Sequence, residues 1–202
     1  MHLYNNSMQQ KMKPDVTGRV VWLDVARAFG IYAIYLGHFG EAAGPAYRFA
    51  FQFHVPLFFF LAGCTEIYNR EESVLGNLKR NVKTILLPAY FFAVLSLIIY
   101  VINANADLTE TCLWGQLIIK GLVRNTYLAA SLWFLTCLFV VRTIFALLKK
   151  MKKWYWLVAA GIFLFLLAEY GMSPRPIDSP RYYYNLDSAC YYKHFYIIGI
   201  LA

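Results

Sequence analysis

Charged residues are scarce in this sequence, and acidic residues are the scarcest of them. Only 15% of the 202 residues are Asp, Glu, Lys or Arg, whereas 60% are hydrophobic. Soluble globular domains carry about 25% charged residues, so the composition excludes an ordinary soluble domain and favours an integral membrane protein embedded in a lipid bilayer. The 19 basic residues outnumber the 11 acidic ones. They form short clusters between apolar runs instead of one basic surface, so binding to nucleic acid is not expected.

The sequence also lacks cysteine motifs and a signal-peptide cleavage site. Its four cysteines show no CxxC spacing, so no metal site is expected. Cys64 and Cys137 lie in apolar runs and are expected to be buried. Cys112 and Cys190 lie in segments expected outside the cytoplasm, where a disulfide between them is an open alternative. Residues 1–18 are polar and carry no small-residue cleavage site, so the first apolar run is expected to remain as an anchor.

Long apolar runs make up most of the chain. Five of them approach the roughly 20 residues that a helix needs to cross a bilayer. They span residues 20–38, about 49–68, about 84–103, about 131–148 and 154–170. A sixth run, at 194–202, stops after nine residues, or about 13 Å of helix. None alternates with period 2, which favours helices over a barrel. The predicted fold is therefore all-α, a polytopic transmembrane helix bundle with about five complete spanning helices and a truncated sixth.

The basic clusters predict the orientation of the chain, because they occupy alternate gaps between the apolar runs. The positive-inside rule assigns such gaps to the cytoplasm. The gaps expected on the cytoplasmic side are the polar N-terminus 1–18, the loop 69–83 and the turn 149–153. The gaps expected on the outer side are residues 41–48, 105–130 and 171–193.

One polar stripe lies on the first apolar run. Arg27 and His38 are eleven residues apart. At about 100° per residue this is three turns plus roughly 20°, so both side chains point to the same side of a helix, about 16 Å apart along its axis. Asp24 lies three residues before Arg27 and can pair with it. A charge in a spanning helix costs about 2.5–3.5 kcal/mol on insertion scales. The stripe is therefore expected to face protein or a water-filled cavity.

His38 and Arg27 are the candidate catalytic residues of this stripe. Histidine exchanges protons near neutral pH, so His38 suits general-base work on a hydroxyl. The alternative is an interfacial histidine at a helix end. Arg27 presents a planar fork of donors that suits phosphate or carboxylate, and the alternative is a structural pair with Asp24. The shared stripe favours the functional interpretation of both residues.

Other polar groups lie on the second run and before the third. His54 either joins the cavity as a supporting residue or lies at the membrane interface, and composition alone favours the interface. Pro56 is expected to kink its helix, and Gly63 is expected to let a neighbouring helix approach closely. Before the third run, a basic cluster either sets the topology or docks a phosphate-bearing donor from the cytoplasm. That cluster consists of Lys79, Arg80 and Lys83.

The order of these motifs resembles the acyltransferase-3 family of integral membrane O-acyltransferases, and within it the branch of the fucose 4-O-acetylases. That family opens with an arginine, ten residues and a histidine, which is the spacing of Arg27 and His38. A Phe-His-x-Pro-Leu-Phe-Phe-Phe-Leu-Ser-Gly stretch follows, which residues 53–63 match except for Ala62 in place of serine. The further segments that resemble the family are residues 22–24, 79–90, 133–135 and 186–199.

This resemblance implies transfer of an acyl group, expected to be acetyl, from acyl-CoA to a sugar hydroxyl of a cell-surface glycan. It implies that His38 deprotonates the acceptor hydroxyl or relays the acyl group. Arg27 would hold a donor phosphate or stabilise charge at the thioester carbonyl, with Asp24 and His54 in support. The implied donor-binding residues are Lys79, Arg80 and Lys83. No bound cofactor is expected, because acetyl-CoA enters as a substrate. The expected location is the bacterial inner membrane, where the reaction would be O-acetylation of a cell-envelope polysaccharide.

The resemblance also bears on domain organisation. The family usually has more spanning helices than these five, so residues 19–202 are expected to be the N-terminal part of a membrane acyltransferase domain. Two alternatives stay open from the sequence. One is a transporter or permease fragment that uses the stripe as a substrate or proton path, and the other is a truncated, inactive remnant of the enzyme. A transporter predicts internal repeats or paired interrupted helices, and the sequence shows no such repeat.

Overall fold

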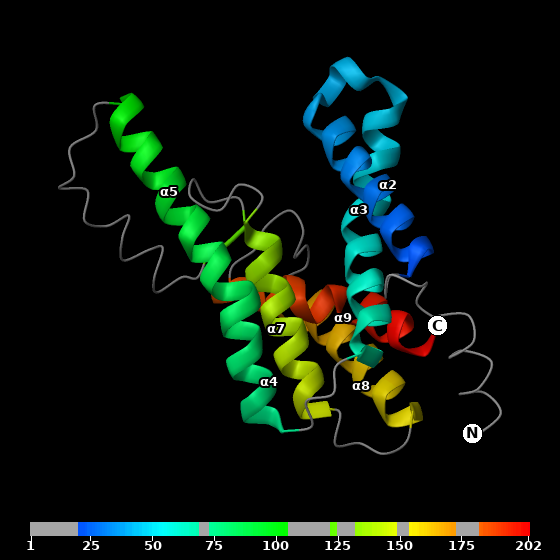
Figure 1. Cartoon of the computed structure of the whole chain (residues 1–202). Helices are drawn as coiled ribbons and strands as arrows, with labels where there is room; N and C mark the ends of the chain where they lie inside the picture. Colours follow the sequence, from blue (N-terminus) through cyan, green and yellow to red (C-terminus); the bar gives the residue numbers. More distant parts are fainter. Residues whose placement is uncertain (1–19, 69–72, 105–121, 125–131, 149–153, 173–181) are drawn as a thin grey trace. The chain divides into compact units, whose positions relative to one another are not determined.

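Every regular element that the structure describes is helical, which confirms the all-α fold class. The computed structural model, shown in Figure 1, describes residues 20–68, 73–104, 122–124, 132–148, 154–172 and 182–202. By its internal contacts the chain divides into two compact units. The first comprises Met1–Asn69 with Phe195–Ala202, and the second comprises Arg70–His194. Each unit is described by itself.

The first unit is built on a pair of helices. Helix α2 spans Val21–His38 and helix α3 spans Pro45–Cys64, with a short 3-10 turn at Gly40–Ala43 between them. The two helices lie side by side (Figure 1). Pro45 begins α3 at the position where a helix needs no backbone donor. A second 3-10 turn, Thr65–Tyr68, follows α3.

Small and apolar side chains hold this helix pair together. The residues that α2 buries recur every three to seven positions, as one face of a helix does: Leu23, Gly30, Ala33 and Gly37. Leu23 packs with Leu61 and Cys64 of α3 in a small core. The large apolar residues on the rest of α2 stay exposed, among them Tyr32 and Tyr35.

Two glycines set the contact between α3 and the end of helix α9, which spans Leu186–Leu201. A Cβ on Gly63 would collide with the backbone of Tyr196, and a Cβ on Gly199 would collide with the backbone of Phe60. The two helices therefore approach more closely than residues with side chains allow, which confirms the prediction for Gly63. Beside this contact, Tyr196 Oη donates to the buried Glu66 Oε2 over 2.6 Å.

Replacing Gly63 by alanine is expected to destabilise the first unit. Forcing a methyl group into this contact should cost about 1–3 kcal/mol, although alanine has the better helix propensity by about 1 kcal/mol. Gly171→Ala is the control, because a Cβ there would meet only the flexible side chain of Leu167. Thermal unfolding of the two variants in detergent measures the difference. Equal unfolding midpoints for both variants would contradict the close contact.

The second unit contains a long helix with an irregular middle. Helix α4 (Val74–Asn81), a π-helical segment (Val82–Leu86) and helix α5 (Leu87–Ala104) follow one another without a break. Ser73 caps the start, since its Oγ accepts a hydrogen bond from Gly76 N over 2.9 Å. Lys83 therefore lies in a π-helical turn, an irregularity that is frequent at functional sites.

The start of this long helix corrects the boundary expected from the sequence. The loop expected at 69–83, with a helix from about residue 84, is wrong because α4 begins at Val74. The first turns carry several polar residues, and two of them, Asn77 and Asn81, are buried against the rest of the unit. A search for apolar runs misses such a segment because its apolar content is low. The basic cluster consequently lies within the helix and not before it.

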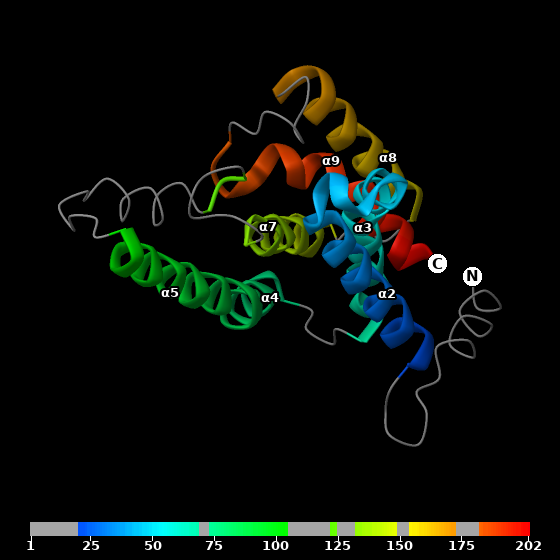
Figure 2. The ribbon, with the colours of Figure 1, turned by 90° about the horizontal axis from the view of Figure 1, so that it is seen from above.

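Three more helices complete the second unit. Helix α7 (Trp133–Leu148) packs against α4 and the π-helical segment, and its start contacts a 3-10 turn at Tyr183–Asn185. Figure 2 shows α7 beside α4. Helix α8 (Trp154–Leu166) continues into a second π-helical segment, Leu167–Met172. The first part of α9, up to His194, belongs to this unit as well.

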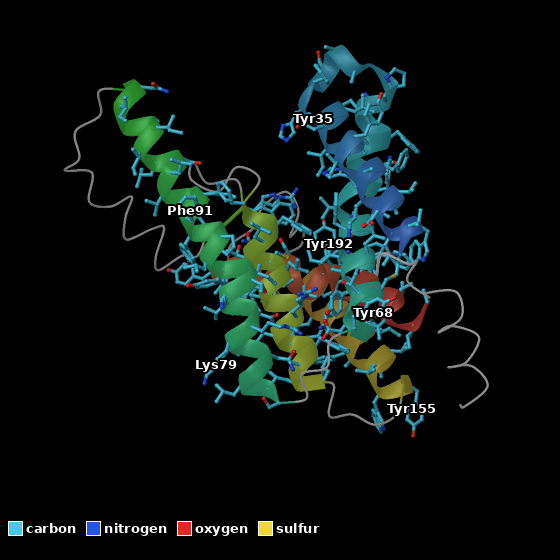
Figure 3. The ribbon with its side chains drawn as sticks, in the orientation of Figure 1. Tyr35, Tyr68, Lys79, Phe91, Tyr155 and Tyr192 are labelled. Carbon is cyan, nitrogen blue, oxygen red and sulfur yellow. The ribbon has the colours of Figure 1, made fainter. Side chains whose placement is uncertain are left out.

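Two helices of the described residues are long and apolar enough to cross a membrane, Val74–Tyr100 and Tyr155–Met172. Trp133–Leu148 is apolar but shorter. Helix α5 also exposes a row of large apolar side chains, including Phe91 (Figure 3), which suits contact with lipid better than contact with water. The expected number of five spanning helices is not confirmed and stays a prediction.

Candidate functional site

An ion pair forms at the start of the polar stripe on α2. Arg27 Nη1 lies 3.1 Å from Asp24 Oδ1, which confirms the pairing predicted from their spacing. Both side chains are about half exposed, at 45% and 47%. The pair holds the guanidinium toward the N-terminal end of α2, the direction in which helix side chains lean.

His38 is the last residue of α2, and its side chain is exposed. By helical geometry, the stripe of Asp24, Arg27 and His38 lies about 100° round the helix from the buried face of α2. The described residues therefore leave the stripe open on the flank of the helix pair. We still expect the stripe to face protein or a water-filled cavity, and this stays a prediction. The catalytic role of the stripe also stays a prediction.

Arg27 and His38 do not reach one atom of a substrate together in this conformation. They are about 16 Å apart along the axis of α2, and the ion pair with Asp24 directs the guanidinium away from His38. This separation distinguishes the two roles implied for Arg27. Contact with a distant donor phosphate is compatible with a reaction at His38, whereas contact with the reacting thioester carbonyl is not.

His54 lies on α3 and is half-buried. Its Nδ1 lies 2.6 Å from Ala50 O. Because a carbonyl oxygen can only accept a hydrogen bond, Nδ1 is the donor. In the neutral ring Nε2 is therefore the basic nitrogen. The ring of the adjacent Phe53 stacks on Phe29 of α2, with centroids 5.5 Å apart. This contact brings His54 close to the level of Arg27 along the helix pair. A supporting role for His54 stays a prediction.

The basic cluster lies where α4 passes into the π-helical segment. Lys79 and Lys83 are exposed, and Figure 3 shows Lys79 projecting from the helix. Arg80 is half-buried and donates through Nη2 to Asn77 Oδ1 over 3.2 Å. Because helix residues four apart lie on one face, the two lysines form one basic edge. The structure describes this edge in the second unit and the α2 stripe in the first. Docking of a donor at the edge stays a prediction.

A buried asparagine in the second unit was not singled out from the sequence. Asn185 is completely buried. Both the nitrogen and the oxygen of its side-chain amide form hydrogen bonds with the backbone of residues 122–124. Nδ2 donates to Leu122 O over 3.0 Å, and Oδ1 accepts from Arg124 N over 2.6 Å. Nδ2 also donates to Thr136 Oγ1 over 2.8 Å and to Trp133 O over 3.3 Å. These five residues are called the asparagine hub below.

Residues with a strained backbone lie in the asparagine hub and directly next to it. Within the described ranges, the non-glycine residues with positive φ are Leu122, Tyr184 and Asn185, at 55°, 56° and 57°. Asparagine tolerates this region, but a bulky side chain rarely enters it, and each such residue costs about 1–3 kcal/mol. Tyr90 Oη on α5 donates to Tyr184 Oη over 3.1 Å and so ties the hub to the long helix. Strain of this kind concentrates at functional sites, which makes the hub a second candidate site.

Two charged residues of α9 are also completely buried, Asp187 and Lys193. Lys193 Nζ donates to Val141 O over 2.6 Å and lies 5.1 Å from the centroid of the Phe145 ring. The helix start expected at residue 194 is wrong, because α9 already begins at Leu186; the outer location expected for residues 171–193 stays a prediction. The three-residue spacing of Asp187, Cys190 and Lys193 is compatible with one face of a helix. A search for apolar runs misses this helix start, because the charged residues interrupt the run.

Comparison with known proteins gives a family match. The model of the acyltransferase-3 family, described as an acyltransferase domain, matches residues 20–202. The matched range includes every residue of the α2 stripe, the basic cluster and the asparagine hub. No curated protein and no solved structure matches the chain.

Proposed function

Because the chain belongs to the acyltransferase-3 family, we propose that it is a membrane O-acyltransferase that moves an acetyl group from acetyl-CoA to a sugar hydroxyl of a cell-surface glycan. The observation that carries this proposal is the polar stripe of α2, which combines a histidine with an arginine–aspartate pair on the exposed flank of a helix. A proton acceptor and a binder of anions on one stripe are what acyl transfer from a phosphate-bearing donor requires.

His38 is the general base in this mechanism. Its imidazole takes the proton of the acceptor hydroxyl while the hydroxyl oxygen attacks the thioester carbonyl. The new carbon–oxygen bond forms, the carbon–sulfur bond breaks, and the imidazolium returns the proton to the leaving thiolate. The products are the O-acetylated sugar and CoA with a free thiol.

Arg27 holds the donor at a distance from the reacting carbon. In acetyl-CoA the pantetheine arm separates the thioester from the phosphates, so an arginine about 16 Å from the base suits the phosphate end of the donor. Asp24 orients the guanidinium through the 3.1 Å ion pair. His54, whose Nε2 is the basic nitrogen, supports binding of the donor at the level of Arg27.

The basic edge of Lys79 and Lys83, with Arg80 beside it, captures the donor from the cytoplasm. Exposed amines attract the phosphates of acyl-CoA, and the positive-inside rule gives the same residues a cytoplasmic location. The proposed site of action is the plasma membrane of a bacterium, with the N-terminus of the chain in the cytoplasm and the acceptor glycan outside.

Labelled acetyl-CoA tests the proposed reaction. Inverted membrane vesicles from cells with the native gene should transfer labelled acetyl to glycan, in an ester that mild base releases. Vesicles from cells without the gene should not. Equal base-labile label in both preparations would overturn the proposal, as would uptake of label by the vesicles without ester formation, which a transporter predicts.

Replacing Arg27 by glutamine is expected to raise KM for acetyl-CoA roughly tenfold to a hundredfold, because a charged hydrogen bond to the donor is lost. The kcat at saturating donor should change little. Asp24→Asn should cause a smaller rise in the same constant. Arg48→Gln is the control, since Arg48 is an exposed arginine of α3. A fall in kcat at unchanged KM would place Arg27 at the reacting carbonyl instead.

A further inference from the structure

The side chain of Arg124 carries hydrogen-bond donors that meet no acceptor. Its backbone N–H is fixed by Asn185 Oδ1, and its guanidinium carbon lies 4.2 Å from the centroid of the Trp133 ring. Nε and Nη1 are buried and have no hydrogen-bond partner in the described part of the chain. A buried charged donor without an acceptor is unfavourable. The strained asparagine hub therefore holds an arginine in a state that a bound anion would relieve.

Tyr192 and Asp187 are two titratable groups that lie near Arg124. Burial raises the pKa of Tyr192 to about 12, although the charge of Arg124 and its side-chain hydrogen bond to the phenol lower the pKa, so this phenol stays neutral at physiological pH. Asp187 is the nearby carboxylate, and its Oδ1 accepts the Ser188 N–H over 2.8 Å. The site thus offers a guanidinium beside the aromatic rings of Trp133 and Tyr192, whose centroids lie 6.5 Å apart.

The asparagine hub contacts the long helix at a point far from the basic edge of that helix. Tyr90, which bonds Tyr184 next to Asn185, follows Lys79 by eleven residues, or about 16 Å of helix. Trp133 begins α7, and the far end of α7 precedes the lysine-rich turn 149–153. With the basic clusters on the cytoplasmic side, Arg124 belongs to the outer half of the unit. On the proposed function, that half meets the glycan.

We propose that Arg124 and Trp133 form an acceptor subsite that binds the carboxylate of an acidic sugar. The proposal rests on the proposed function, which assigns the outer half to the acceptor. The Nε and Nη1 donors of a guanidinium suit an oxyanion, and in the outer half of the unit the oxyanion expected on a glycan is the carboxylate of an acidic sugar. Aromatic rings beside such a polar anchor are the common lining of small-molecule sites. The phosphates of acyl-CoA are the other source of an oxyanion, and kinetics separates the two.

Two forms of one acceptor test the subsite in membrane vesicles that contain the full chain. The first is the cell's own glycan, and the second is the same glycan with its carboxyl groups converted to neutral amides. Arg124→Gln should raise KM for the native glycan roughly tenfold to a hundredfold, with no change in KM for the neutral form or for acetyl-CoA. Arg124→Lys, which keeps the charge but loses the planar fork, should lie between. Arg142→Gln is the matched control, because Arg142 Nε is also buried without a partner, away from the hub.

The outcomes separate this subsite from the proposed reaction. An equal loss of transfer to both glycan forms would give Arg124 a structural role and overturn the subsite. A rise in KM for acetyl-CoA would assign Arg124 to the donor and overturn it as well. Absence of transfer by the unmodified protein would overturn the proposed reaction but not the subsite. Calorimetric measurement of glycan binding would then test the subsite directly. The purified protein should bind the native glycan more tightly than the amide, and equal binding would overturn the subsite.

Discussion

Replacing His38 by alanine is expected to lower the rate of acetyl transfer by about 10²–10⁴-fold, the usual contribution of a general base. The amount of protein in the membrane should not change, because the side chain is exposed at the end of α2 and loses no packing among the described residues. The base-labile acetyl content of the glycan, measured at saturating acetyl-CoA, reports the rate. Glu41→Gln is the matched control, since Glu41 is exposed in the turn that follows the helix.

The kinetic constants distinguish His38 from Arg27. Loss of the base should lower kcat and leave KM for acetyl-CoA near its original value, whereas loss of Arg27 should raise KM. His38→Gln should behave like the alanine variant, because an amide cannot take up the proton. Unchanged acetylation in either His38 variant, with the protein expressed from its native gene, would exclude this histidine as the base.

Replacing Asn185 by alanine is expected to lower the stability of the second unit by at least about 3 kcal/mol. The change leaves Leu122 O, Trp133 O, Thr136 Oγ1 and Arg124 N without their common partner. It also removes the side chain that tolerates the left-handed backbone best at this position. Thermal unfolding of the detergent-solubilised protein, followed by tryptophan fluorescence, measures the loss.

A second buried asparagine supplies the control for this prediction. Asn81 is also buried in the second unit, but its Oδ1 has no hydrogen-bond partner. Replacing Asn81 by alanine therefore breaks fewer interactions and should cost much less than Asn185→Ala. Asn185→Asp should lie between the two, because it keeps the acceptor for Arg124 N and loses the Nδ2 donors. Equal destabilisation by Asn81→Ala and Asn185→Ala would show that the hub contributes no more than an ordinary buried side chain.

Local patterns were sufficient for the helical class and for several helix positions. The expected run 20–38 corresponds to α2 at Val21–His38, and the expected run 154–170 corresponds to α8 with its π-helical end. The Asp24–Arg27 ion pair followed from spacing alone. Each of these features depends on residues within a few turns of one another, so periodicity and hydropathy are enough to find it.

The starts of α4 and α9 were missed for one physical reason. Both begin with residues that are polar yet buried, such as Asn77 in α4 and Asp187 in α9. A polar side chain can be buried when it finds hydrogen-bond partners. Some of those partners come from distant segments, as Val141 does for Lys193. Hydropathy along the chain counts such residues as exposed and places the helix boundary too late.

The sequence by itself determined that the chain is helical and apolar, that Arg27 and His38 share one stripe, and which family it resembles, a resemblance that the family match confirms. Only the tertiary structure decided where Asn185 would find its partners, 49 residues away at Thr136 and 63 away at Leu122. Hydrogen bonds between segments so far apart depend on how helices pack, and no local period encodes that packing. The position of the Arg124 guanidinium, whose Nε and Nη1 have no hydrogen-bond partner among the described residues, likewise depends on the tertiary structure.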